Sequence, residues 1–229
     1  MRRKPSFTPE LFRFLSQLRK NNYREWFAAN KARYESSVRD PFLRFIADFA
    51  PFLRKISPYF VADPSPTRGS MMRIYRDIRF SKDKSPYKTS VAAYFRHENG
   101  KEGATPGFYL QLEPGKSFIG AGLWRPEPKA VKTIRDAIAK DSKQWRTATT
   151  GREFHSSFDF GGESLKRPPR GYDGTHPFIE DIKRKDFVAG ATLPDGDVCS
   201  PDFLATLVKR LRILTPYMRF LTGAVGLPF

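Results

Sequence analysis

The stretch Phe108-Tyr-Leu-Gln-Leu-Glu-Pro-Gly-Lys-Ser-Phe-Ile-Gly-Ala-Gly-Leu123 decides how this chain is expected to fold. Its first part alternates apolar and polar side chains, with Phe108, Leu110 and Leu112 on one side, which is the period-two pattern of a half-buried strand. Residues 113–116 then have the composition of a tight turn, and residues 117–123 form a second apolar run. The stretch therefore predicts two antiparallel strands joined by a short turn.

Neighbouring segments extend this pair into a larger sheet. Residues 91–95 alternate in the same way, residues 72–80 alternate before them, and residues 187–193 are a candidate for a last strand. The early strands are short and are joined by turn-rich linkers such as residues 97–100. An antiparallel meander is therefore the most economical topology.

Helices are predicted on both sides of the sheet in the sequence. Thr8-Pro9-Glu10 begins one, because Thr suits the N-cap, Pro the first helical position and Glu the positive end of the helix dipole. Asp40-Pro41 and Ser200-Pro201-Asp202 are similar signals, and Pro216 should end or bend the last helix. We therefore expect a single α+β domain, an antiparallel sheet meander flanked by N-terminal and C-terminal helices: helical in residues 1–57, sheet-rich in 68–124, with helices and loops in 127–229.

The charge of the chain limits its partners without selecting one. The sequence has 41 Lys and Arg against 24 Asp and Glu, a formal net charge of +17, which favours nucleic acid, phosphorylated metabolites or anionic surfaces. Cys199 is the one cysteine, so an intrachain disulfide framework is excluded and a cytoplasmic location is expected. No run approaches the ~20 apolar residues of a membrane span, so no transmembrane segment is predicted.

Residues 73–88 concentrate six cations and two acids among aromatic side chains, and an Arg fork or a Lys ammonium is suited to phosphate or carboxylate. If residues 72–80 form a strand, one of its faces and the following loop present the predicted anion contacts, which are Arg73, Tyr75, Arg79, Lys82, Lys84, Tyr87 and Lys88. The alternative is an exposed face on which Asp77 and Asp83 merely pair with neighbouring cations. Anion binding is favoured, because two acids cannot neutralise six cations.

Arg76 falls on the apolar side of that expected strand. A guanidinium in such a position must be paired or must reach water, so we expect an ion pair with an acid elsewhere in the chain. The sequence does not identify that acid.

Residues 165–177 form a second basic segment. Two prolines exclude it from a sheet ladder and its glycines allow close backbone approach, so it is expected to be a rigid exposed loop leading into a helix at His176-Pro177. Its predicted anion contacts are Lys166, Arg167, Arg170 and Tyr172. Two interpretations stay open: this loop faces the first basic segment across one cleft, or it is an ordinary proline-rich connection with solvated charge.

Familiar catalytic motifs are absent from the sequence. His97, His155 and His176 are far apart and lack the Cys or carboxylate spacing of metal sites, so no metal is predicted. There is no Walker loop, no glycine-rich dinucleotide motif and no nucleophile elbow, and the cofactor question stays open. Trp26, Phe27, Trp124 and Trp145 are expected in the core or an interface rather than as base-stacking platforms.

The first basic segment, the residues Lys166-Arg-Pro-Pro-Arg-Gly-Tyr172 leading to His176-Pro177, and the early Asn21-Asn22-Tyr-Arg-Glu-Trp-Phe27 resemble the domain of unknown function 2461 family of bacterial and fungal proteins. The resemblance covers nearly the whole chain. It implies one soluble domain, and it supplies no catalytic roles to transfer.

The favoured hypothesis is a binding module that holds a phosphate-rich partner, with nucleic acid ahead of a phosphorylated metabolite. The alternative is an enzyme acting on a phosphorylated or carboxylated small molecule in a cleft between residues 73–88 and 166–177, with Asp77 or His176 as general acid or base. A protein-interaction domain whose charge serves solubility is the third possibility. The sequence leaves the oligomeric state open.

Overall fold

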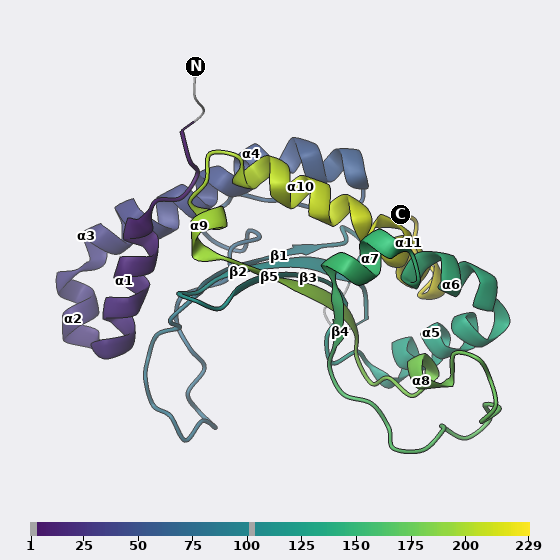
Figure 1. Cartoon of the computed structure of the whole chain (residues 1–229). Helices are drawn as coiled ribbons and strands as arrows, with labels where there is room; N and C mark the ends of the chain where they lie inside the picture. The colour runs from purple at the N-terminus through teal and green to yellow at the C-terminus, as the bar shows by residue number, and fades with distance from the viewer. Residues whose placement is uncertain (1–3, 101–103) are drawn as a thin grey trace.

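The two strands predicted from residues 108–123 form the middle of a five-stranded antiparallel sheet with the order β1-β2-β3-β5-β4. The computed structural model describes residues 4–100 and 104–229 (Figure 1). Phe108 lies opposite Ala121 and Leu110 opposite Ile119, as a tight turn between the strands requires. The strands are β1 (Val91–Arg96), β2 (Gly107–Leu112), β3 (Ser117–Leu123), β4 (Asp159–Gly161) and β5 (Phe187–Leu193). The antiparallel sheet and the α+β class are confirmed.

Helices precede the sheet, as the capping signals predict. Pro9 takes the first helical turn of α1, although the side chain of Thr8 makes no capping hydrogen bond. The last helix of the group, α4, continues through Pro51. The elements are α1 (Pro9–Lys20), α2 (Arg24–Ala29), α3 (Lys31–Tyr34), a π-helical turn η1 (Glu35–Arg39) and α4 (Asp40–Ile56).

Helices also follow the meander, and several of them pack around the inserted strands β4 and β5. Pro216, expected to end or bend the last helix, stands in the first turn of a new one, α11. The elements are α5 (Pro128–Lys140), α6 (Ser142–Thr149), α7 (Arg152–Ser157), α8 (Ile179–Ile182), α9 (Asp195–Val198), α10 (Phe203–Ile213) and α11 (Thr215–Ala224). Within the described residues, no helix combines the length and apolar character needed to cross a membrane.

One face of the sheet carries the main core. Helices α4 and α10 lie over this face (Figure 1), and the alternate residues Phe108, Leu110 and Leu112 of β2 are buried beneath them. Aromatic rings fill the layer between helices and sheet, for example Phe49 against Phe95 of β1 with ring centroids 4.9 Å apart. The intervening residues Tyr109 and Gln111 point to the opposite, more exposed face. The period-two pattern of β2 therefore arises because one face of the strand is buried and the other is not.

The outer edge of β1 is covered by the chain that approaches it. The N–H of Met72 donates to Ala92 O (2.8 Å) and the N–H of Tyr94 donates to Ser70 O (2.9 Å). Further along, the N–H of Val61 donates to Arg96 O (3.0 Å). Residues 59–72 therefore satisfy most of this edge without forming a regular strand.

The strand expected over residues 72–80 is not formed, and this prediction is wrong. After an isolated bridge between Met71 and Ala93, the chain leaves the sheet and folds back on itself, with Tyr75 bridged to Tyr87. The apolar side chains that alternate over residues 72–80 are therefore not held on one face of a sheet. Phe80, the last of them, is 95% exposed. We call residues 73–88 the basic arm.

Candidate functional site

The basic arm is a protruding loop whose two limbs are joined near the sheet by main-chain hydrogen bonds. The N–H of Arg76 donates to Pro86 O (2.9 Å) and the N–H of Lys88 donates to Ile74 O (2.7 Å). Beyond these bonds the arm extends from the side of the sheet that faces away from α4 and α10 (Figure 1). Its outer side chains are open to a partner arriving from solvent.

The base of the arm is held by the helical hairpin that α1 and α2 form on either side of Asn22. Asn22 uses its whole side-chain amide on the main chain of Tyr87: Oδ1 accepts the N–H (3.0 Å) and Nδ2 donates to the carbonyl (2.9 Å). The Tyr87 ring stacks on Phe27 with centroids 4.1 Å apart and planes at 21°, and Tyr87 is 5% exposed. The structure therefore places Tyr87 in the core rather than among the anion contacts predicted for it.

The two acids of the arm are committed to local partners. Asp77 accepts from Arg79 Nε (3.0 Å) and Nη2 (2.8 Å), and these hydrogen bonds lower the pKa of Asp77. Asp83 accepts from the N–H and hydroxyl of Ser85 and from Arg76, which together lower the pKa of Asp83 well below its usual range. The partner expected for Arg76 is therefore Asp83, an acid of the same arm, and the Arg76 side chain is 27% exposed rather than fully buried.

The other cations of the arm have no acid partner in the described part of the chain. Lys84 Nζ donates to the carbonyl of Ile78 (3.0 Å), an interaction that leaves its charge uncompensated. Burial, followed by the charge of Arg73, lowers the pKa of Lys88. An anion bound beside Lys88 would offset both the desolvation of its ammonium group and the repulsion from Arg73. The unneutralised cations are Arg73, Lys82, Lys84 and Lys88.

A pocket of about 510 Å³ lies at the base of the arm, and we call it the arm pocket. Its walls come from α2 and α3, from the π-turn η1, from residues 66–68 and from the first residues of the arm. Among the charged residues that line it are four cations and one acid, which are Lys31, Arg39, Arg68, Arg73 and Glu35. Arg39 is already paired with Glu35 (2.7 Å) and with Asp40 (2.9 Å), so the other three cations supply the net positive charge.

The backbone around the arm pocket has two uncommon features. The first is the π-helical turn η1, which lies between α3 and α4. The second is Arg68, a non-glycine residue with a φ of 62°, in the left-handed region. Such features concentrate at functional sites, where other interactions hold an unfavourable geometry. Burial raises the pKa of Tyr34, a further lining residue, to about 12, so its phenol is a hydrogen-bond donor at neutral pH.

Sequence reasoning missed four residues of the arm pocket: Lys31, Tyr34, Arg39 and Arg68. No motif marks a π-turn in this sequence. These residues come together because the helical hairpin packs against the arm. This is a tertiary contact between segments far apart in the sequence, and no local pattern predicts it. A positive residue next to a glycine after a proline-rich stretch, as in Arg68-Gly69, is the single local signal that the sequence offered.

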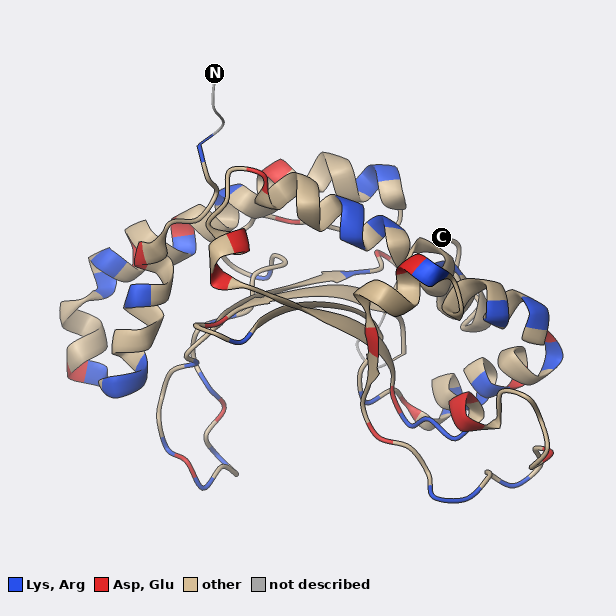
Figure 2. Cartoon of the chain, in the orientation of Figure 1, with Lys and Arg blue, Asp and Glu red and all other residues tan. Residues whose placement is uncertain are grey.

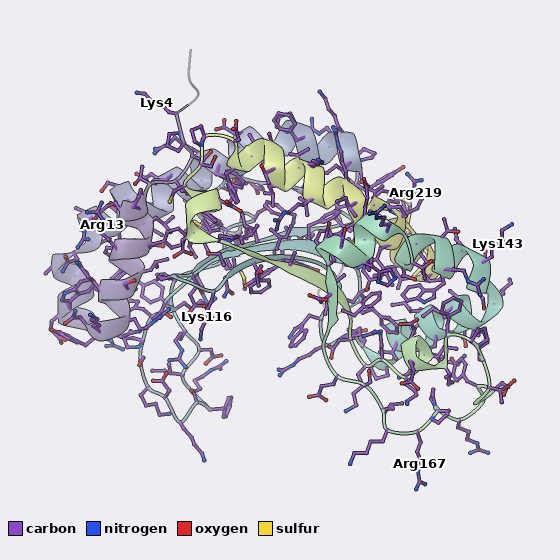
Figure 3. The ribbon with its side chains drawn as sticks, in the orientation of Figure 1. Lys4, Arg13, Lys116, Lys143, Arg167 and Arg219 are labelled. Atoms are coloured by element: carbon purple, nitrogen blue, oxygen red, sulfur yellow. The ribbon has the colours of Figure 1, made fainter. Side chains whose placement is uncertain are left out.

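Residues 166–177, the second basic loop, form an exposed excursion after β4. Lys166, Arg167 and Arg170 are exposed, and Arg167 points outward from the turn of the loop (Figure 3). Tyr172 is half-buried and its hydroxyl donates to Asp136 of α5 (2.7 Å); burial first, and then this bond, raise the pKa of Tyr172 to about 12. Tyr172 therefore anchors the loop, whereas the three cations are free to meet solvent.

His176, the other candidate acid or base, has both ring nitrogens in use. Nδ1 accepts the N–H of Phe178 (3.1 Å), and Nε2 lies 3.0 Å from the hydroxyl of Ser142. With Nδ1 as acceptor, the neutral ring carries its proton on Nε2 and donates to Ser142. The predicted helix at His176-Pro177 begins later, at Ile179, and His176 holds the turn before it.

The basic arm and the second basic loop lie at opposite ends of the sheet (Figures 1 and 2). The arm adjoins β1 and the second loop follows β4, and these strands are the two edges of the sheet. Of the two interpretations left open for the second loop, the strand order favours a separate connection over a cleft shared with the arm, because it places the two segments at different edges of the sheet. Asp77 and His176 belong to separate regions.

Within the described residues, no group of three or more His, Cys, Asp or Glu side chains could hold a metal ion. His97 is buried, with Nδ1 accepting the N–H of Asn99 (3.2 Å) and Nε2 3.0 Å from the carbonyl of Pro228. A structural role accounts for this histidine.

Comparison with known proteins identifies the chain at the family level. The model of one family, described as conserved hypothetical protein (DUF2461), matches residues 10–220. No curated protein matches the chain.

Proposed function

Because the chain belongs to the conserved hypothetical protein family DUF2461, whose description states no activity, we propose a function from the site itself: binding of a nucleic-acid strand by the basic arm and the arm pocket. One observation carries this proposal. The acids of the arm are consumed by Arg79, Ser85 and Arg76, whereas the remaining cations of the same protruding segment are left without acid partners in the described residues.

Charge and shape both favour a long anion over a single small one. The arm presents its free cations along an extended, protruding segment, and the arm pocket adds Lys31 and Arg68 at its base. Successive phosphates of a strand can meet successive cations in this way, and each contact displaces a counterion. The protonated hydroxyl of Tyr34 is suited to a further phosphate oxygen.

Phe80 adds a reason to prefer nucleic acid among polyanions. It is 95% exposed, and the guanidinium of Arg79 lies 5.8 Å from its ring centroid. An exposed aromatic ring among cations is what single-stranded binding proteins use to stack bases, whereas a bare phosphate gains nothing from it. An exposed ring of this size otherwise carries the cost of contact with water.

The catalytic alternative has weaker support. Hydrogen bonds from Arg79 keep Asp77 ionised by lowering its pKa, which is the opposite of what a general acid needs. His176 is bonded at both nitrogens, in a region remote from the arm. Asp77 is thus paired with Arg79, and His176 is engaged elsewhere, so neither residue stands free to exchange a proton at the arm pocket.

Fluorescence anisotropy with a labelled single-stranded oligonucleotide, measured between about 50 and 200 mM salt, tests the proposal. The variant that combines Arg73→Gln, Lys82→Gln and Lys84→Gln is expected to bind more weakly and to lower the slope of log affinity against log salt by about 2. The control variant combines Lys166→Gln, Arg167→Gln and Arg170→Gln, and removes the same charge from another exposed loop. Equal losses in both variants, or no binding at low salt, would refute the assignment to the arm.

A further inference from the structure

A second pocket, of about 480 Å³, lies after the end of β3, at the opposite end of the sheet from the arm (Figure 1). It is bounded by residues 124–126 before α5, by α5 itself, and by the chain that follows β4 and precedes β5, and no residue of the second basic loop lines it. We call it the strand-end pocket. The proposed nucleic-acid site does not involve it.

The walls of the strand-end pocket are fixed by one buried carboxylate. Asp186 is 5% exposed, and it accepts the N–H of Arg125 (2.7 Å) through Oδ1 and the N–H of Glu163 (2.9 Å) through Oδ2. Arg125 has a φ of 49°, an uncommon conformation for a non-glycine residue that this bond helps to hold. At Gly162 a Cβ would lie 2.3 Å from the side chain of Asp186, so only glycine allows this approach. The pocket is therefore preformed, which lowers the cost of binding.

An aromatic ring is available at the mouth of this pocket. Trp124 is 59% exposed, unlike Trp145, which is fully buried, and the guanidinium of Arg125 lies 5.8 Å from the Trp124 ring centroid. Pro126, Pro128 and Val131 continue the apolar lining. A flat ring stacked on Trp124 would cover exposed apolar surface and meet the guanidinium at its edge.

The inner wall of the pocket is suited to an anion. Arg135 Nη2 donates to the carbonyl of Arg184 (2.8 Å), but its Nε is buried and has no hydrogen-bond partner among the described residues. Nε therefore does not face the pocket, and Arg135 contributes the positive charge of its guanidinium to this wall, which it lines. No side chain caps the N-terminus of α5, which opens on the same pocket at Pro128. Lys185 is already paired with Glu163 (3.0 Å), which leaves Arg125 and Arg135 as the cations for a ligand.

We propose that the strand-end pocket binds a small planar aromatic anion of mononucleotide size, with its ring on Trp124 and its anionic group near Arg125, Arg135 and the first turn of α5. The proposal stands on this pocket alone. Loss of nucleic-acid binding at the arm would leave it unaffected.

Tryptophan fluorescence provides a direct test, because Trp124 is the most exposed of the three tryptophans, whereas Trp26 is partly buried and Trp145 is fully buried. AMP is expected to quench the emission saturably, and to bind at least about tenfold more tightly than either adenosine or inorganic phosphate, since each of these offers only one half of the contacts. Isothermal titration calorimetry gives the affinity independently of the fluorophore. Trp124→Ala is expected to abolish AMP binding in that measurement.

Arg125→Gln separates recognition of the anion from recognition of the ring, because it keeps the backbone N–H that Asp186 accepts. It is expected to weaken AMP about tenfold and to leave the weak binding of adenosine unchanged. Arg170→Gln, which removes a cation from the neighbouring second basic loop, is the matched control and should leave AMP binding unchanged. The absence of saturable AMP binding in the folded wild-type protein would overturn the proposal. So would AMP binding no tighter than phosphate binding, or AMP binding that survives Trp124→Ala and Arg125→Gln.

Discussion

The clamp between Asn22 and Tyr87 gives the sharpest prediction about the basic arm. Asn22→Ala removes both partners of the Tyr87 main chain, which form bonds of 3.0 and 2.9 Å in a residue that is 5% exposed. A buried donor or acceptor left without a partner costs about 1–3 kcal/mol. With one donor and one acceptor affected, and with water able to reach part of the site after local loosening, we expect a loss of about 2–4 kcal/mol in the free energy of unfolding.

Urea unfolding followed by circular dichroism measures this loss, and limited trypsin digestion reports the arm itself. Trypsin cleaves after Lys82 and Lys84, which are exposed in the arm, so a loosened base should increase the rate of cleavage at these bonds. Asn21→Ala is the matched control, because Asn21 donates to Gln17 O (3.0 Å) at the exposed end of α1 and does not contact the arm through that bond. We expect about 0.5 kcal/mol for the control, with cleavage unchanged.

The result that contradicts this reasoning is specific. If Asn22→Ala destabilises the protein no more than Asn21→Ala and the arm is cleaved at the wild-type rate, then the amide clamp does not position the arm. The stack of Tyr87 on Phe27 would then hold the base by itself.

Two further predictions concern the arm and its pocket. Phe80→Ala should leave the free energy of unfolding unchanged, because the ring is 95% exposed, but should weaken single-stranded oligonucleotide binding by about 1–3 kcal/mol without altering its salt slope; unchanged affinity in the anisotropy assay would exclude stacking. The raised pKa of Tyr34, about 12 against 10.0 for a free phenol, means that the folded protein keeps a proton that the unfolded chain has lost, so stability should fall as pH rises from about 10 to 12. Urea unfolding of Tyr34→Phe in this range should show a shallower fall than the wild type, and parallel curves would show that Tyr34 does not contribute.

The sequence predicted the sheet correctly where an alternating segment was followed by a second strand that could pair with it. The alternation at Phe108, Leu110 and Leu112 was interpreted correctly because a turn and a second apolar run followed directly, and helices α4 and α10 then covered the apolar side. The same alternation over residues 72–80 led to a wrong prediction. There the chain bonds to itself through Tyr75 and Tyr87, so the pattern had no neighbouring strand to give it meaning.

The sequence indicates the positive charge of the candidate site but not its shape. The excess of cations in the arm is visible in the sequence, and the pairing of Asp77 and Asp83 with arm residues is local enough to have been weighed. The arm pocket is not, because it depends on a π-turn without a sequence signature and on the packing of α2 and α3 against the arm. The separation of the two basic segments follows from strand order, in which β5 inserts between β3 and β4.

The covering of β1 by residues 59–72 has a consequence for how copies of this protein meet. A free edge strand is a template for strand addition and aggregation, and here one edge is already hydrogen-bonded while the other, β4, is only three residues long. Neither edge offers a long ladder to a second sheet. We therefore expect that copies of this protein do not polymerise through their sheets.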